Sequence, residues 1–390
     1  MKTQVGIIGG GPAGLLLSQV LHRHGIASVI LERQSREYVL GRIRAGVLER
    51  GTVEMLRRAG VGGRLDWQGL VHGGVNLSFG GKLHRIDLEA LTGGSTVTVY
   101  GQTRVTEDLY AARDAEGGTI IDLAEDVTPH GVDGCSPSLT YRKDGADHRI
   151  DCDFIAACDG YHGVGRQSFP TGAITEYVKD YPFGWLGILS ETRPADQELI
   201  YGAHEKGFVL CSMRSPSLSR YYVQAPLDTD LGDWPDDRFW EELKSRLPGD
   251  VASSIETGPS NEKSLAPLRS FVAEPLSYGR LFLAGDAGHI VPPTGAKGLN
   301  LAVSDVHYLS NGLIGFYRNG DEAGLKNYSD LALARVWKAV RFSWWMTVMM
   351  HRFDEDDAFA QRMRQTELDY LVNSEAAMKA MAENYVGLPY

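Results

Sequence analysis

The pattern of apolar residues at the start of the chain predicts a strand, a helix and a second strand. Residues 5–8 and 28–31 are short apolar runs, and residues 15–21 between them form a helix-like apolar stretch. Short apolar runs of this kind are typical of buried parallel strands joined by a crossover helix. The segment therefore predicts a βαβ unit at the start of a doubly wound, Rossmann-like α/β domain.

Two later apolar runs each end in a short acidic turn. Residues 153–157 run into Asp159-Gly160, and residues 281–284 run into Gly285-Asp286. Because the carboxyl ends of parallel strands open onto the ligand crevice, both aspartates are expected to face a nucleotide. Asp-Gly is also a common turn, but the strand before it favours a site. Since these runs belong to the same sheet as residues 5–8, the domain must be discontinuous.

The inserted part is predicted to be a mostly antiparallel sheet. Runs rich in Val, Thr and Tyr indicate strands at residues 75–79, 95–100, 185–189, 208–214 and 220–224. From about residue 321 the pattern becomes helical. We expect three parts: a nucleotide-binding domain (1–71, 98–178 and 269–318), a substrate-binding sheet domain (72–97 and 179–268) and a C-terminal helical interface region (319–390).

Composition limits which ligands, partners and cellular location are expected for the chain. Its 390 residues are 43% hydrophobic, which is enough for a large core, and the net charge of −11 argues against nucleic-acid binding. The four cysteines show no C-x-x-C pair and no metal-like spacing, so reduced thiols, no metal and a cytoplasmic location are expected. The apolar segment 342–350 is shorter than the ~20 residues of a membrane span, which favours a buried helix face or a homodimer contact.

A glycine fingerprint lies between the first strand and the first helix. Gly9, Gly11 and Gly14 follow the G-x-G-x-x-G spacing of dinucleotide-binding turns. The first glycine allows the tight turn, the second lets a pyrophosphate approach the backbone, and the third lets helix and strand pack closely. Glu32 ends the second strand, where an acid binds the adenosine ribose. The segment therefore predicts a bound dinucleotide.

The segment 279–300 indicates that the dinucleotide is a flavin. Asp286 stands at a strand end, where its carboxylate can accept hydrogen bonds from a polyol chain such as ribityl. A loop rich in Pro and Gly then leads to a helix whose first turn, near Leu299 and Asn300, offers free backbone N–H groups to an electron-rich ring. No second glycine fingerprint follows another strand, so a separate nicotinamide domain is not expected.

The stretch 208–224 carries hydroxyl and basic side chains on one face of a predicted hairpin. Ser212 and Arg214 are two apart in one extended run, as are Arg220 and Tyr222 in the next. A turn at 215–219 would pair Ser212 with Tyr222 and Arg214 with Arg220. Facing arginines repel unless an anion or an acidic neighbour intervenes, and a guanidinium beside hydroxyls suits a carboxylate. A carboxylate site is favoured, with a solvated basic face as the alternative.

Four longer motifs resemble those of the single-component flavin-dependent aromatic hydroxylases. They are residues 42–47, 181–187, 285–300 and 383–389, and the resemblance extends over the whole chain. It implies tightly bound, non-covalent FAD. The residues implied to hold FAD are Gly9, Gly11, Gly14, Glu32, Arg42, Arg44, Gln102, Asp159, Asp286, Leu299 and Asn300. One departure is visible, because Gly163 stands where the wider superfamily has Ser after its Asp-Gly motif.

The same resemblance implies oxygen transfer to a phenolic acid. It predicts NADPH- and O2-dependent hydroxylation of 4-hydroxybenzoate at C3 to 3,4-dihydroxybenzoate, through a hydroperoxide of the reduced flavin. Ser212, Arg214 and Tyr222 would hold the carboxylate, Tyr201 and Pro293 would contact the phenolic oxygen, and Tyr385 and His72 would extend a proton chain. Such a chain is needed because a free phenol has a pKa near ~10 and stays protonated at neutral pH.

NADPH is expected to bind at the surface, without a domain of its own. The resemblance implies contacts from Arg33, Gln34, Tyr38, His162, Arg166 and Arg269. The first two directly follow Glu32 and suit the 2′-phosphate of NADPH. Three other functions fit part of the sequence: a hydroxylase of another phenol such as 3-hydroxybenzoate, an NAD(P)-dependent dehydrogenase, and a non-catalytic flavin sensor. The dehydrogenase leaves Gly285-Asp286 without a role.

Overall fold

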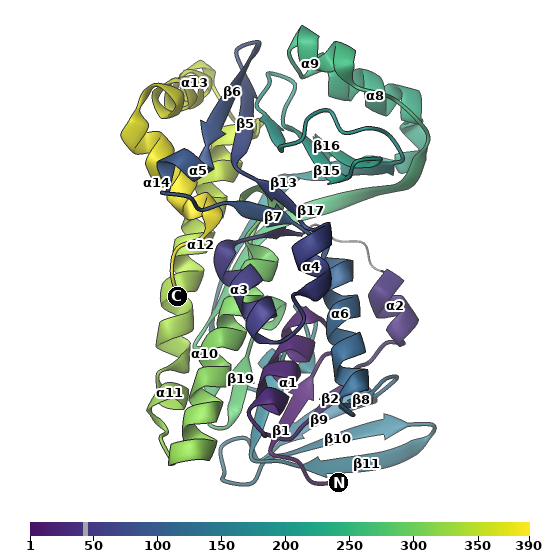
Figure 1. Ribbon diagram of the computed structural model, residues 1–390, viewed down its shortest axis with the longest axis vertical. Helices are drawn as coiled ribbons and strands as arrows, with labels where there is room; N and C mark the ends of the chain where they lie inside the picture. The colour runs from purple at the N-terminus through teal and green to yellow at the C-terminus, as the bar shows by residue number, and fades with distance from the viewer. Residues whose placement is uncertain (42–45) are drawn as a thin grey trace.

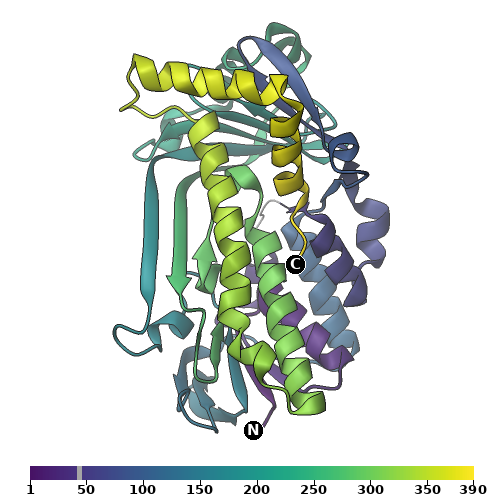
Figure 2. The same ribbon diagram turned by 90° about the vertical axis from the view of Figure 1, so that its left-hand side faces the viewer.

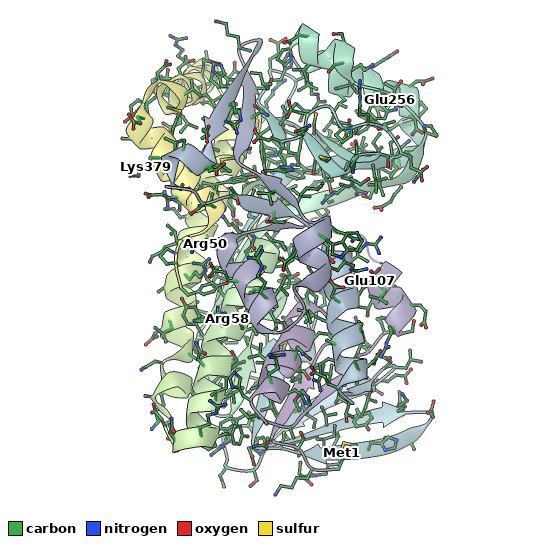
Figure 3. All side chains as sticks on the ribbon, viewed as in Figure 1. Met1, Arg50, Arg58, Glu107, Glu256 and Lys379 are labelled. Carbon is green, nitrogen blue, oxygen red and sulfur yellow. The ribbon has the colours of Figure 1, made fainter. Side chains whose placement is uncertain are left out.

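The molecule is elongated, with a mostly parallel sheet toward one end and a larger, mostly antiparallel sheet toward the other (Figure 1). The computed structural model describes residues 1–41 and 46–390. Met1 lies at one end, and Glu256 and Lys379 lie on the two sides of the opposite end (Figure 3). Within these described ranges, no helix combines the length and the apolar character that crossing a bilayer would require.

The first sheet is built from the apolar runs that the sequence shows. Its strand order is β18 (Ser277–Tyr278), β19 (Leu281–Leu283), β12 (Phe154–Ala157), β1 (Val5–Ile8), β2 (Ser28–Leu31) and β8 (Thr119–Ile121). All strands except β18 run parallel, and β1 and β12 are buried along their whole length because both faces of the sheet are covered. The predicted doubly wound α/β domain is therefore confirmed.

Helices pack on this sheet and around its edges. α1 (Pro12–Arg23) contacts both α6 (Gln102–Ala115) and α10 (Gly298–Asn319). The shorter helices are α2 (Arg36–Gly41), α3 (Arg50–Arg58), α4 (Gly63–Gln68) and α7 (Val164–Gln167). A three-stranded antiparallel sheet of β9 (Glu125–His130), β10 (Ser138–Lys143) and β11 (Ala146–Asp151) lies near Met1 (Figure 1).

The second large sheet has eight strands and carries the predicted hairpin. Its order is β20 (His289–Ile290), β17 (Ser260–Glu274), β13 (Thr175–Ser190), β16 (Leu218–Pro226), β15 (Val209–Ser215), β14 (Ile200–Gly202), β5 (Gly74–Phe79) and β6 (Lys82–Asp87). One face packs against α8 (Asp236–Ser245) and α9 (Gly249–Ser254). The other face packs against the C-terminal helices and α5 (Leu88–Leu91).

Two features of this region differ from the sequence-based expectation. The sequence predicts that the run 95–100 belongs to the inserted sheet, but its strand β7 (Val97–Val99) pairs with β3 (Val47–Leu48) and β4 (Leu70–His72) in a separate small sheet. β13 and β17 are also much longer than their apolar runs, because polar residues continue each strand beyond the core. The boundaries predicted at 178/179 and 268/269 fall inside these two strands.

The C-terminal region is helical, as its pattern predicts. It contains α11 (Ala323–Lys326), α12 (Tyr328–Met350), α13 (Ala358–Asn373) and α14 (Glu375–Val386). α12 runs along the molecule, α13 crosses its end, and α14 turns back beside it (Figure 2). The residues of α12 and α14 that face inward join the core of the eight-stranded sheet.

Candidate active site

The three fingerprint glycines lie where β1 passes into α1, and their surroundings differ. A Cβ on Gly9, whose φ is 105°, would lie 2.3 Å from the Cys158 carbonyl oxygen, and one on Gly14 would lie 2.0 Å from the Gly9 oxygen. A Cβ on Gly11 would meet nothing within 4 Å. The helix also has no side-chain cap, so its first N–H groups face open space suited to a phosphate.

A cavity of about 250 Å³ extends from this turn across the ends of the parallel strands. Glu32 lines it, and its two carboxylate oxygens accept hydrogen bonds from the backbone N–H groups of Gly10 (2.6 Å) and Gln34 (2.8 Å). The other predicted FAD residues that line this cavity are Gly9, Gly11, Gln102, Asp159, Asp286 and Leu299. Arg42 and Arg44 lie outside the described residues.

Asp159 explains the unusual glycine at position 163. Its carboxylate accepts a hydrogen bond of 2.8 Å from the backbone N–H of Gly165, at the start of α7. A Cβ on Gly163 would lie 2.1 Å from the carboxylate carbon of Asp159. Burial raises the pKa of Asp159, and the N–H groups of α7 act in the opposite direction. The absence of a side chain at 163 thus lets the carboxylate close onto the helix start.

The start of α10 presents backbone rather than side chains to the cavity. The helix has no side-chain cap, and Gly298 and Leu299 line the cavity. The Asn300 amide is fully used elsewhere: it accepts from the Glu49 N–H (2.9 Å) and the Thr52 hydroxyl (2.7 Å) and donates to two carbonyl oxygens. A contact between Asn300 and a cofactor would therefore have to come from its backbone.

The predicted NADPH residues form two groups. Arg33, Gln34 and Tyr38 line the cavity beside Glu32. His162, Arg166 and Arg269 surround the ring of Tyr161 instead, with ring centroid distances of 4.9, 4.9 and 5.0 Å. Arg166 donates to Glu176 and to two backbone carbonyls, and Arg269 donates to Asp180. These last two guanidinium groups already have protein partners.

One face of the eight-stranded sheet brings the predicted substrate residues together. Tyr201 and Tyr222 both lie opposite Leu210, on either side of β15, and Ser212 lies opposite Arg220. The predicted pairing of Ser212 with Tyr222 is therefore wrong, because β15 and β16 are joined by a tight turn between Ser215 and Leu218 with a bulge at Arg214. Before the bulge the register differs by two residues, so Ser212 and Tyr222 keep their predicted face, and Arg214 at the bulge still reaches the Tyr222 hydroxyl.

The two arginines of the hairpin have different partners. Arg220 lies 3.0 Å from Glu262 and donates to the Ser264 hydroxyl at 3.1 Å, so the acidic neighbour required by the sequence is present. For Arg214, Nε and Nη1 are buried and have no partner in the described part of the chain. Burial lowers the pKa of Arg214, although the nearby Tyr222 hydroxyl opposes this. A buried guanidinium with open donors fits a ligand carboxylate.

A pair of buried tyrosines lies on the same sheet face. The hydroxyls of Tyr201 and Tyr385 are 2.9 Å apart, and burial raises the pKa of Tyr201 to about 12 and that of Tyr385 further. The hydrogen bond to Tyr385 makes Tyr201 the more acidic of the two. His72 is buried in β4, and neither of its ring nitrogens has a partner among the described residues. Pro293 is solvent-exposed, ahead of the start of α10.

Comparisons with known proteins agree on one family. The model of the FAD binding domain matches residues 2–343. A p-hydroxybenzoate hydroxylase from Acinetobacter baylyi is 54% identical over 100% of this chain and 96% of its own length. The chain belongs to the FAD-dependent aromatic hydroxylases. A pentachlorophenol 4-monooxygenase from Sphingobium chlorophenolicum is 22% identical over 78% of this chain and 56% of its own length.

Solved structures show that the hydroxylase fold extends over the whole chain. The p-nitrophenol 4-monooxygenase from Pseudomonas putida has a TM-score of 0.82 at 19% identity and covers 100% of both chains. An aklavinone-11 hydroxylase in complex with FAD and aklavinone has a TM-score of 0.74 at 19% identity, over 93% of this chain and 70% of its own. The family model and the Acinetobacter relative confirm the predicted FAD cofactor and hydroxylase family.

The hydroxylase site also contains a buried ionic cluster that sequence patterns did not indicate. Glu49 accepts from Lys297 (2.6 Å) and from Arg335 (2.7 Å), and Lys297 also donates to the carbonyl oxygen of Tyr385 at 3.0 Å. A Cβ on Gly387 would lie 2.2 Å from a Glu49 carboxylate oxygen. This cluster fixes the end of α14, and with it Tyr385, against the start of α10. The glycine of the tail motif 383–389 was the one available signal.

Proposed function

We propose that this hydroxylase converts 4-hydroxybenzoate to 3,4-dihydroxybenzoate with FAD, NADPH and O2. The observation that carries the proposal is the guanidinium of Arg214, which lies beside Tyr222 on the face of the tyrosine pair and whose Nε and Nη1 are buried without a partner among the described residues. A cationic clamp and a phenolic hydrogen-bond chain suit a ring with a carboxylate at one end and a hydroxyl at the other. The name of the Acinetobacter relative supports the same substrate.

The carboxylate end supplies most of the binding energy in this proposal. Arg214 donates two hydrogen bonds to the carboxylate, and the hydroxyls of Ser212 and Tyr222 donate to its remaining lone pairs. Since Nε and Nη1 are already shielded from solvent, the substrate displaces little tightly held water from these two donors. The clamp fixes one end of the ring and so defines where its hydroxyl lies.

The residues around the substrate hydroxyl accept its proton and pass it on. Tyr201 accepts a hydrogen bond from the substrate hydroxyl, and Tyr385 stabilises negative charge that develops on Tyr201. Burial lowers the pKa of His72, although Glu198 and Asp196 oppose this, so a neutral imidazole is available to accept the proton beyond Tyr385. The resulting phenolate is electron-rich at the ring carbon beside its oxygen, which is the position that is hydroxylated.

When bound, FAD would supply the redox chemistry that couples oxidation of NADPH by O2 to hydroxylation, with one oxygen atom entering the product and the other released as water. Glu32, Gln102, Asp159 and Asp286 would hold it through its sugar, phosphate and polyol parts, and the uncapped start of α10 would stabilise negative charge on its ring. The buried aromatic residues around Tyr201 exclude water from the site. Arg33 and Gln34 are proposed to bind the 2′-phosphate of NADPH.

We further propose that the hydroxylase forms a homodimer through α12 and α13. Trp344 is 47% exposed, Phe359 70% and Tyr370 60%, and all three lie on these helices. Aromatic residues are enriched at subunit interfaces. A second copy of the same chain would bury them.

A substrate panel tests the proposed reaction. The holoenzyme is assayed for NADPH oxidation and for product with 2-, 3- and 4-hydroxybenzoate and with 4-hydroxybenzamide. We expect rapid oxidation and equimolar 3,4-dihydroxybenzoate only with 4-hydroxybenzoate. Equal yields from the 3-isomer would favour the other phenolic acid as substrate, and peroxide as the sole product would contradict the hydroxylation itself.

A further inference from the structure

A buried histidine lies behind the proposed substrate site. His351 follows α12 directly and has no exposed surface. Its Nδ1 lies 3.0 Å from the carbonyl oxygen of Thr347, and its Nε2 lies 2.7 Å from the indole nitrogen of Trp185. A carbonyl can only accept, so Nδ1 carries the proton and Nε2 accepts from the indole. Burial lowers the pKa of His351 to about 3, so the ring stays neutral at working pH.

The imidazole is also the centre of an aromatic stack. It lies parallel to the ring of Phe183, at 4.8 Å and 5°, and to that of Phe208, at 4.3 Å and 22°. Trp185 stacks on Phe208 in turn, at 4.9 Å and 19°. His351 therefore holds three rings of the β-sheet face in place, one by a hydrogen bond and two by stacking.

These rings connect the two ends of the proposed site. Trp185 contacts Tyr222 of the carboxylate clamp at 5.0 Å, and Phe208 lies 6.2 Å from Tyr201 of the phenol end. Trp185, Tyr222 and Tyr201 lie on one face of the sheet, since Tyr222 is paired with Gly187, two residues from Trp185, and both tyrosines flank Leu210. A tilt of the indole would change the space between clamp and tyrosine pair.

We propose that His351 is a positioning residue that sets the length of the substrate site and thereby selects para- over meta-hydroxybenzoates. The inference rests on the proposed function. Simple core packing would need an aromatic ring of this size but no hydrogen-bond acceptor at Nε2. The structure shows an acceptor. Without it, the buried indole N–H would lose its hydrogen-bond partner, and the indole ring would tilt toward another acceptor.

The test compares variants that remove either the hydrogen-bond acceptor or the aromatic ring of His351. H351F keeps a ring for stacking and removes the acceptor, whereas H351Q keeps an acceptor near Nε2 and removes the ring. W185F removes the donor, and H351F/W185F removes both. W240F is the matched control, because Trp240 is equally buried and donates to the Gly258 oxygen at 2.9 Å, but packs on the opposite face of the sheet.

Each holoenzyme is assayed for kcat, KM and coupled product with 4- and 3-hydroxybenzoate. We expect H351F to lower the ratio of kcat/KM values for the 4- and 3-isomers roughly tenfold, mainly through KM for the 4-isomer, and H351Q to restore most of it. The double variant should be no worse than W185F, and W240F should keep the wild-type ratio. The indole signal of Trp185 in ¹⁵N-Trp-labelled protein should shift in H351F and not in W240F.

Several outcomes overturn the inference. They are an unchanged isomer ratio in H351F, additive effects in the double variant, or the same loss in W240F. If H351F does not fold, W185F and H351Q decide by the same ratio, with W185F expected to lose selectivity and H351Q to keep it. A wild-type enzyme that makes no 3,4-dihydroxybenzoate contradicts the proposed function instead, and the shift of the Trp185 signal still reports whether His351 holds the indole.

Discussion

Two buried donors of Arg214, Nε and Nη1, have no partner in the described part of the chain, and this leads to two predictions of opposite sign. Arg214→Met replaces a buried charge by an apolar chain of similar length. In the free enzyme, a buried donor without a partner costs about 1–3 kcal/mol, so its removal should raise the free energy of unfolding by that order. In the complex, the clamp is lost, and removing one partner of a buried charged hydrogen bond costs about 2–5 kcal/mol of binding energy.

The expected loss of affinity is therefore roughly 30- to 5,000-fold for 4-hydroxybenzoate, since about 1.4 kcal/mol corresponds to a factor of ten. The dissociation constant is measured by titration of the holoenzyme, and the thermal midpoint is measured with and without substrate. 4-Hydroxybenzamide, which has no charge at that end, should lose much less affinity than the benzoate. The ratio of the two losses isolates the interaction between guanidinium and carboxylate.

Arg246→Met is the matched control for stability. Arg246 is also buried, but its Nη1 donates to the carbonyl oxygens of Phe208 and Gln224, at 3.1 and 3.0 Å. Its removal should lower the thermal midpoint, whereas Arg214→Met should raise it. An equal loss of affinity for benzoate and benzamide, or a free enzyme that Arg214→Met destabilises, would refute the assignment of Arg214 to the carboxylate.

Three further predictions follow from the geometry. Tyr201→Phe should retain substrate-stimulated NADPH oxidation but form product about 10²- to 10⁴-fold more slowly, because the proton has no acceptor; a normal product yield would exclude the tyrosine pair from proton transfer. Gly163→Ala should weaken FAD binding about tenfold, since its Cβ would displace the Asp159 carboxylate; FAD release is followed by fluorescence, with Gly249→Ala as control because a Cβ there meets nothing within 4 Å. His351 binds its proton only in the unfolded state between pH 4 and 6, so the unfolding free energy should fall by about 1.4 kcal/mol per unit as pH decreases. His351→Gln should reduce this slope by the same amount, and parallel slopes from urea unfolding at pH 4, 5 and 6 would contradict a neutral His351.

Local chemistry made part of the site predictable from sequence. Gly9, Gly11 and Gly14 have roles that depend only on the backbone around them, and each finds the predicted surroundings. The strand ends that carry Asp159 and Asp286 were also visible, because apolar runs followed by turns have a short-range signature. The alternation of side chains along β15 and β16 fixed their face even though the predicted turn was wrong.

Contacts between distant segments could not be predicted in the same way. Glu49, Lys297 and Arg335 form one buried cluster from three separate elements, and no spacing in the chain relates them. The run 95–100 has strand character but nothing in it specifies its partner strands, so the sheet predicted for it is wrong. The partners of His351 lie on β13 and directly before β15, more than a hundred positions earlier in the chain.

The two long crossing strands restrict how this fold can be recombined with its relatives. β13 and β17 pair along nearly their whole length, from Thr175 opposite Glu274 to Ser190 opposite Ser260. A chimera that exchanges the substrate-binding part by cutting inside either strand would pair strand segments from two different proteins. Those segments were not selected to pair with each other. Crossover points in the loops that follow Ser190 and precede Ser260 would keep this pairing intact. These loops are therefore the positions at which substrate specificity can best be exchanged between relatives.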